Sequence, residues 1–99
     1  HACGLMTDGQ GVCWGANRDG QASVPAGRYT QISAGASHSC AVTMDGQGVC
    51  WGSNRDGQTS VPAGRYTQIS AGENVSCAVT IGGNVACWGR TIDVLLPAG

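Results

Sequence analysis

Short stretches in which polar and hydrophobic residues alternate, separated by glycine-rich turns, follow one another along the chain. In residues 27–35, threonine, isoleucine and alanine alternate with polar side chains, and the same pattern returns in residues 64–72. An alternation with a period of two predicts a β-strand. Residues 40–50 hold two β-prone stretches on either side of Asp45-Gly46, which is typical of a hairpin. No segment shows the pattern of a helix, so we expect an all-β protein.

The pattern repeats with a period of 37 residues. His38-Ser39-Cys40 restarts what His1-Ala2-Cys3 begins, and Val75-Ser76-Cys77 starts it a third time. Residues 1–37 and 38–74 share 28 identities, whereas the third copy diverges after Gly89. Fixed-period similarity is the sequence signature of a repeat architecture with atypical terminal copies. We therefore predict one repeat domain over residues 1–99, made of copy one (1–37), copy two (38–74) and a truncated capping copy (75–99).

Each copy carries two cysteines that nine residues separate. In a short chain, an even number of regularly spaced cysteines is typical of a disulfide framework, which forms in an oxidising compartment. A structural zinc site is one alternative, but its cysteines are usually about two to four residues apart. The second alternative is that the cysteines stay reduced and pack in the core. We predict no metal and three disulfides, Cys3–Cys13, Cys40–Cys50 and Cys77–Cys87.

The cysteine spacing also predicts the register of each hairpin. If Cys40 and Cys50 face each other across an antiparallel pair, the turn is the three-residue loop 44–46, with Gly46 in the left-handed conformation. The same arithmetic gives the loops 7–9 and 81–83, again with glycine third. This register places Ser39 opposite Trp51 and Ser76 opposite Trp88. With the linking strand, each repeat then has three or four short strands, the size of one propeller blade.

Size and charge exclude several classes of partner. A chain of 99 residues buries only about 65% of the surface that its unfolded form exposes, so disulfides or an oligomer are expected to stabilise it. The net charge is −1 and every basic residue is an arginine, without the cluster that nucleic-acid binding needs. No apolar run is long enough for a membrane span. We expect a secreted protein, whose first residue, His1, would fit a mature form or a trimmed one.

Residues 35–42, 45–46, 50–52 and 54–58 together resemble the repeat of the regulator-of-chromosome-condensation superfamily. They are most similar to its short bacterial form, to which the secreted β-lactamase inhibitory protein II is also similar. The resemblance implies a β-propeller, usually of seven blades, whose loops face partners. Two features depart from the family: this chain has fewer than three copies, and it lacks the charged face that suits a GTPase or chromatin.

Three hairpins share only two intact linking strands, so one hairpin has no neighbouring strand. Propellers hide such open edges by closing a ring of about four to eight blades. Our hypothesis is that chains associate head to tail, with residues 92–96 at the junction, so that two chains give six blades. A head-to-tail contact that does not close would give a fibre. A disulfide-held monomer is the third alternative.

Catalysis needs convergent groups, and the chain offers few. The histidines are His1 and His38, and the third copy has Val75 at that position. Asp8 and Asp45 fall in turns, where aspartate has a conformational role. The loop at residues 17–21 offers too few oxygen ligands for calcium. We therefore expect no enzyme and no cofactor.

Binding is the better class of function. Arginine, asparagine and glutamine on a repeated loop suit polar ligands, and tryptophans stack on sugars. Solvated turns and packing between blades are the competing roles for the same residues. The candidate binding residues are Asn17, Arg18, Asp19, Gln21, Asn54, Arg55, Asp56, Gln58, Trp14, Trp51 and Trp88.

The sequence thus predicts a non-catalytic extracellular binding or assembly module, whose partners are copies of itself and a protein or glycan ligand. Its alternatives are a structural subunit of an extracellular fibre and an enzyme inhibitor of the β-lactamase inhibitory type. Asn74-Val75-Ser76 is in addition a glycosylation sequon, which matters only in a eukaryotic secretory pathway.

Overall fold

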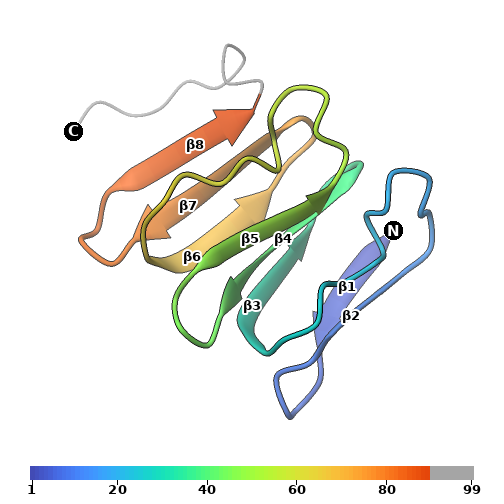
Figure 1. The fold of residues 1–99 in the computed structure, drawn as a ribbon, viewed down its shortest axis with the longest axis horizontal. Helices are drawn as coiled ribbons and strands as arrows, with labels where there is room; N and C mark the ends of the chain where they lie inside the picture. Colours follow the sequence, from blue (N-terminus) through green and yellow to red (C-terminus); the bar gives the residue numbers. More distant parts are fainter. Residues whose placement is uncertain (90–99) are drawn as a thin grey trace.

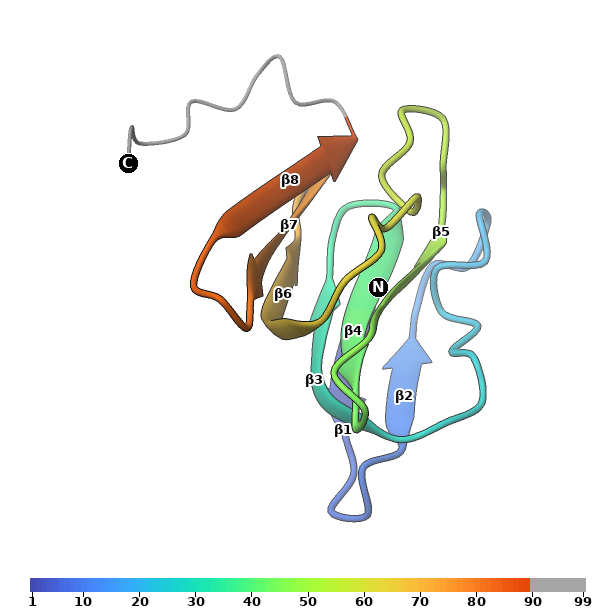
Figure 2. The ribbon, with the colours of Figure 1, turned by 60° about the vertical axis from the view of Figure 1, so that its left-hand side comes forward.

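The structure, a computed structural model, describes residues 1–89, and these form small antiparallel sheets that lie side by side in sequence order (Figures 1 and 2). Within these residues, no helix is long and apolar enough to cross a membrane. The strands are β1 (Ala2–Leu5), β2 (Gly11–Trp14), β3 (Tyr29–Ala34), β4 (His38–Thr43), β5 (Gly48–Gly52), β6 (Tyr66–Ala71), β7 (Val75–Thr80) and β8 (Val85–Gly89).

The predicted all-β, propeller-type architecture is confirmed. The sheets have the strand orders β1-β2, β3-β4-β5 and β6-β7-β8. Each three-stranded sheet combines the linking strand at the end of one copy with the hairpin that opens the next, because β3 pairs with β4 and β6 pairs with β7. A blade therefore straddles the boundary between two copies of the sequence repeat.

The hairpins have the register that the cysteines predict. Cys40 lies opposite Cys50, and Ser39 lies opposite Trp51. The loop closes with a hydrogen bond of 2.9 Å from the Thr43 amide to the Gln47 carbonyl. Its third residue has a φ of 86°, and the third residues of the other two loops have φ values of 89° and 88°, which only glycine adopts readily. The expected disulfides are all formed: Cys3–Cys13, Cys40–Cys50 and Cys77–Cys87.

Pro25 has no backbone N–H to donate, so the segment around it suits only an edge strand or a turn. It forms no strand in the structure, although Arg28, three residues later, makes an isolated antiparallel bridge with Gln10. The hydroxyl of Tyr29, a buried residue of β3, donates a 2.6 Å hydrogen bond to the Pro25 carbonyl and ties the segment down. Tyr66 and Pro62 repeat this contact at 2.6 Å.

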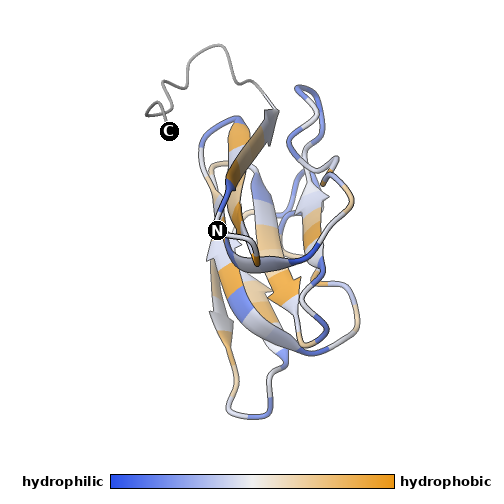
Figure 3. Ribbon diagram, turned by 90° about the vertical axis from the view of Figure 1, so that its left-hand side faces the viewer, coloured by the Kyte–Doolittle hydropathy of each residue, from blue (hydrophilic) through white to orange (hydrophobic). Residues whose placement is uncertain are grey.

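The core lies between the sheets. Strand alternation gives each hairpin a forward face, which holds its disulfide, and a rear face, which holds its tryptophan. On β4–β5 the forward face packs against the sheet β6–β8 and the rear face against β1–β2. Figure 3 shows hydrophobic residues concentrated on the strands and hydrophilic residues in the loops. The forward face of β4–β5 is His38, Cys40, Val42, Gly48 and Cys50, and its rear face is Ser39, Ala41, Val49 and Trp51.

The hypothesis that residues 92–96 contribute to a junction between chains concerns a segment outside the described residues. The described part of the capping copy, residues 75–89, forms a complete hairpin with the same register as the other two. The sequon Asn74-Val75-Ser76 lies where this hairpin begins, with Ser76 buried and Asn74 half-buried in the loop that leads into β7. Glycosylation of Asn74 stays a prediction.

Candidate binding loops and the junctions between sheets

The loop at residues 17–21 is held in one conformation by its own side chains. The Asn17 Oδ1 atom accepts a 2.9 Å hydrogen bond from the Ala22 amide, and the Gln21 Oε1 atom accepts one of 2.8 Å from the Asp19 amide. The loop at residues 54–58 has the same two hydrogen bonds, both of 2.9 Å. The asparagine and the glutamine are thus used within the loop and fix its backbone.

The same loop clasps the following sheet. The backbone carbonyl of Gln21 accepts hydrogen bonds of 2.9 Å from the Trp51 indole and 2.8 Å from the Ser39 hydroxyl. Gln21 is only 4% exposed as a result. The next junction repeats the arrangement, since the Gln58 carbonyl accepts from Trp88 at 2.9 Å and from Ser76 at 2.7 Å. We call each set of these three residues a clasp.

A histidine joins each clasp from the forward face of the preceding hairpin. The Nε2 atom of His38 lies 2.8 Å from the Ser76 Oγ atom, and His1 lies 2.7 Å from Ser39 in the same way. A serine has one hydroxyl hydrogen, and Ser76 donates it to the clasp carbonyl, so the imidazole is the donor in this pair. Burial lowers the pKa of His38, with a backbone contact to Val75 opposing the shift. His38 of β4 thus links its sheet to Ser76 of β7 in the next sheet, and we call such a histidine–serine contact a joint.

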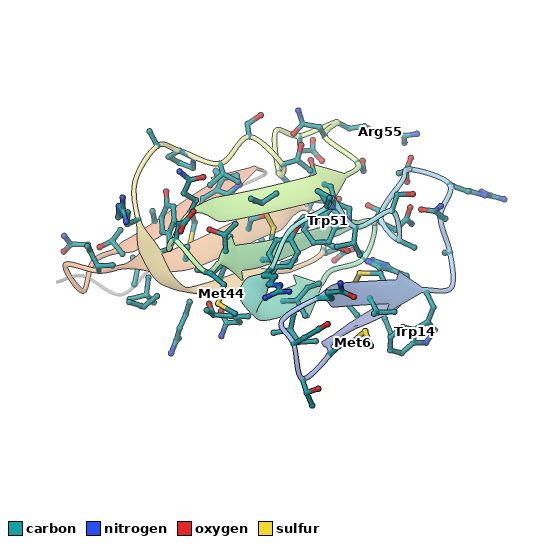
Figure 4. All side chains as sticks on the ribbon, turned by 60° about the horizontal axis from the view of Figure 1, so that its bottom comes forward. Met6, Trp14, Met44, Trp51 and Arg55 are labelled. Carbon is teal, nitrogen blue, oxygen red and sulfur yellow. A yellow bond between two sulfur atoms is a disulfide. The ribbon has the colours of Figure 1, made fainter. Side chains whose placement is uncertain are left out.

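The charged members of the loops remain available to a ligand. Arg18, Asp19, Arg55 and Asp56 are all exposed. The two loops lie at the same end of the sheets, opposite the hairpin turns (Figure 1). Figure 4 shows Arg55 extending away from the sheets. The site that the structure leaves open is therefore a repeated arginine–aspartate pair on a rigid loop.

The tryptophans, also candidates for binding, fall into two groups. Trp51 and Trp88 are 8% and 7% exposed, because each lies under the clasp of the preceding loop. Trp14 is 57% exposed and points outward in Figure 4, whereas Trp51 points into the interior. Of the three, only Trp14 presents its ring to the surroundings.

The roles of Ser39, Ser76 and the clasp carbonyls in linking the sheets were not expected from the sequence. One signal was available: copies two and three carry serine at the position where copy one has Ala2. Within residues 1–89, no three histidine, cysteine, aspartate or glutamate side chains gather in a way that could hold a metal ion.

Comparisons with known proteins agree with this geometry. The model of the regulator of chromosome condensation (RCC1) repeat family matches residues 29–58 and 66–91. Two solved structures are receptor ectodomains. The entire ectodomain of the Physcomitrella patens receptor kinase CR4 is 31% identical with a TM-score of 0.78, over 96% of this chain and 27% of that one. The CRINKLY WD40 ectodomain of the Arabidopsis thaliana receptor kinase ACR4 is 25% identical with a TM-score of 0.74, over 88% of this chain and 33% of that one.

A third solved structure, the C-terminal domain of gp131 from bacteriophage phiKZ, is 31% identical with a TM-score of 0.62, over 69% of this chain and 19% of that one. No curated protein matches the chain. The chain thus spans a third or less of the length of each structure that it resembles. The family match covers more than half of the residues and coincides with the sheets β3–β5 and β6–β8. The chain belongs to the regulator of chromosome condensation (RCC1) repeat family.

Proposed function

We propose that this chain is a non-catalytic extracellular module that binds a protein through its repeated loops. The observation that carries the proposal is the exposed pair Arg18-Asp19, presented again as Arg55-Asp56 on a loop of the same conformation. Arginine and aspartate together offer a planar donor fork and an acceptor, which suit a polar protein surface. Because side-chain hydrogen bonds already hold each loop, binding would cost little further ordering of its backbone.

The extracellular location is supported by two observations. Three disulfides in a chain of 99 residues fit an oxidising compartment. The two receptor-kinase structures that resemble the chain are both ectodomains. A non-catalytic role is supported by the side chains that most often act in catalysis. Both histidines hydrogen-bond to serines between the sheets, and all six cysteines are paired in disulfides.

A protein ligand fits the loops better than a glycan does. Sugar recognition draws on aromatic side chains that stack on the sugar face. Trp51 and Trp88 are buried under the clasps and present no such platform. Trp14 is exposed, but no second exposed tryptophan repeats it beside the loop at residues 54–58, whereas the charged pair occurs on both loops and favours a partner of complementary charge.

The test uses a displayed library of random peptides as the probe. Peptides selected on the wild-type chain should lose about tenfold or more in affinity for R18A/R55A, the range for a lost charge-assisted hydrogen bond. The matched control is R28A/R65A, which removes two exposed arginines near the hairpin turns and should leave the affinity unchanged. Selected peptides that bind R18A/R55A as tightly as the wild type would refute the role of the loops.

A printed glycan array serves as the second arm. Binding to the array that free sugar abolishes, together with agglutination of cells, would replace the protein ligand by a glycan. If the chain neither binds the array nor agglutinates cells, the peptide experiment alone decides whether the loops bind a protein.

The resemblance to the short bacterial repeat favours a second candidate, an inhibitor of the β-lactamase inhibitory type. We place the inhibitory contact at the loop end of the sheets, where Arg55 extends away from them (Figure 4). Titration of a purified serine β-lactamase with the chain tests it: loss of activity at a stoichiometric ratio supports an inhibitor, and full activity at a large excess rejects it.

A further inference from the structure

Within residues 1–89, exposed aspartates stand directly before glycine in two structural settings. Asp8-Gly9 and Asp45-Gly46 lie in hairpin turns, whereas the dipeptides at residues 19–20 and 56–57 lie in the repeated loops. An aspartate in this position can form a cyclic succinimide with the amide nitrogen of the glycine, which has no side chain to obstruct the approach. The dipeptide is the same in every case, so the structure around it decides where the reaction occurs.

The first hairpin turn holds the groups that would have to react. The Gly9 amide donates a 2.9 Å hydrogen bond to the Met6 carbonyl, and the Gly9 carbonyl accepts one of 2.7 Å from the Tyr29 amide. The Asp8 Oδ1 atom accepts a 3.0 Å hydrogen bond from the Gln10 amide. Ring closure in this turn would require the loss of hydrogen bonds that close the hairpin and tie it to β3.

The second hairpin turn is held in a similar way. The Gly46 amide donates to the Thr43 carbonyl at 2.9 Å. The Asp45 carbonyl accepts a 3.0 Å hydrogen bond from the Arg65 guanidinium. The peptide unit between Asp45 and Gly46, which must rotate for the ring to close, is thus hydrogen-bonded through both its amide and its carbonyl.

In the repeated loops, longer hydrogen bonds hold the same amides. The Gly20 amide lies 3.3 Å from the Asn17 carbonyl oxygen, and the Gly57 amide lies 3.2 Å from the Asn54 carbonyl oxygen. Hydrogen bonds of this type are most favourable at about 2.9–3.0 Å and weaken when they are longer. A Cβ atom on Gly20 or Gly57 would have no neighbour within 4 Å, so no packed side chain obstructs rotation of the peptide unit.

The carboxyl groups in these loops are also free to turn. Asp19 and Asp56 are exposed. The hydrogen bonds to the side chains of Gln21 and Gln58 use the amides of the two aspartates and not their carboxylates. Each carboxyl group can therefore reach the amide of the following glycine while the rest of the loop keeps its hydrogen bonds.

From this contrast we infer that Asp19 and Asp56 are sites of spontaneous isoaspartate formation, and that the hairpin turns protect Asp8 and Asp45 from it. In the first step, the glycine amide nitrogen loses its proton and bonds to the side-chain carboxyl carbon, whose hydroxyl group leaves as water. In the second step, a water molecule opens the ring. Opening at the side-chain carbonyl restores aspartate, whereas opening at the main-chain carbonyl routes the backbone through the side chain. The overall composition does not change, and the reaction needs no oxidant or cofactor.

The modification would act on the clasp that follows. Isoaspartate adds a methylene group to the backbone two residues before the clasp residue Gln58, whose carbonyl accepts from Trp88 at 2.9 Å and from Ser76 at 2.7 Å. A shift of this carbonyl would weaken both hydrogen bonds, so modification of Asp56 should loosen the loop from the next sheet. The inference does not rest on the proposed function, since it concerns the chemistry of the loop and not its ligand.

Incubation of the folded chain for several weeks at mildly acidic pH tests the assignment. Protein isoaspartyl methyltransferase, which methylates the isoaspartate carboxylate, measures the total, and electron-transfer dissociation mass spectrometry locates each isomer. We expect about ten times more isoaspartate at residues 19 and 56 than at residues 8 and 45, the factor that corresponds to about one hydrogen bond. In the reduced and denatured chain, which is the control, all four positions should react at similar rates. Equal amounts at the four positions of the folded chain, or none at residues 19 and 56, would overturn the inference.

Glutamate variants locate the signal without mass spectrometry. In D19E/D56E the charge remains, but the longer side chain closes a larger ring much more slowly, so most of the methylation of the aged chain should disappear. The matched control is D8E/D45E, which keeps the loop aspartates and should retain most of the signal. Methylation of aged D19E/D56E at the level of the wild type would contradict the assignment.

Unfolding in urea measures the effect on the clasp. The aged wild-type chain should unfold at a lower urea concentration than the fresh chain, whereas ageing should leave the midpoint of D19E/D56E nearly unchanged. A wild-type chain that is rich in isoaspartate and keeps its midpoint would refute the predicted loosening of the clasp.

Discussion

Replacement of Gly48 by valine copies into the middle of the array the residue that the third hairpin carries as Val85. In the structure, the Cβ atom alone would lie 2.9 Å from Val61 and 3.1 and 3.2 Å from two ring carbons of Tyr66. Tyr66 has little freedom to move, because it is 3% exposed and its hydroxyl donates to the Pro62 carbonyl at 2.6 Å. Its amide also donates to the Gly46 carbonyl at 2.7 Å.

Overpacking of this kind costs about 1–3 kcal/mol, and the better strand propensity of valine returns at most about 1 kcal/mol. The free energy of unfolding of G48V should therefore fall by about 1–2 kcal/mol. Urea titration with the disulfides intact, followed by far-ultraviolet circular dichroism, measures the difference. The control is V85G, which changes an exposed residue and should cost below about 1 kcal/mol. A G48V chain as stable as the wild type would refute the argument that glycine makes room for the next strand.

Other expectations concern a disulfide, a joint and a tryptophan. C40S/C50S should lower the free energy of unfolding by about 3 kcal/mol, because its residues are ten apart and close a short loop, and an unchanged urea midpoint would contradict this. Since burial lowers the pKa of His38, the unfolded chain takes up this proton first as the pH falls below about 6.5. Stability should therefore decrease as the pH falls below about 6.5, less steeply in H38Q, and equal slopes of stability against pH in urea titrations would rule out this group. W51F, which leaves a clasp carbonyl without its indole donor, should lower the free energy of unfolding by about 1–2 kcal/mol, whereas W14F should lower it much less, and equal losses would disprove the distinction.

The hairpins were predictable because three copies constrain one another. Strand pairing has a period of two, and a three-residue loop with glycine third fixes where the pair begins. The agreement of Gly9, Gly46 and Gly83 left a single register, and the structure has it. The linking strands were visible for a similar reason, since their alternation occurs twice with identical residues.

The contacts between sheets were harder to predict. A backbone carbonyl leaves no mark in a sequence, so nothing showed that the Gln21 carbonyl would receive Trp51, thirty residues away. Gln21 looked like a ligand-binding side chain, because glutamine is usually exposed. Trp14 and Trp51 lie in identical local sequence and differ in burial only because a preceding loop covers one of them. The local sequence cannot distinguish such residues, because a loop from elsewhere in the chain decides whether the tryptophan is buried.

The side chains of β3 reach across to the backbone of β6. The Gln31 Oε1 atom accepts a hydrogen bond from the Ile69 amide, and the Ser33 hydroxyl oxygen accepts one of 3.1 Å from the Ala71 amide. β6 is the edge of its sheet, and free amides on an edge strand are a template for pairing with other chains. β3 thus shields the exposed edge of β6. Apolar substitution of Gln31 or Ser33 would remove these acceptors, so Q31L and S33A should open the edge of β6 to pairing with other chains and raise the rate of amyloid-like aggregation.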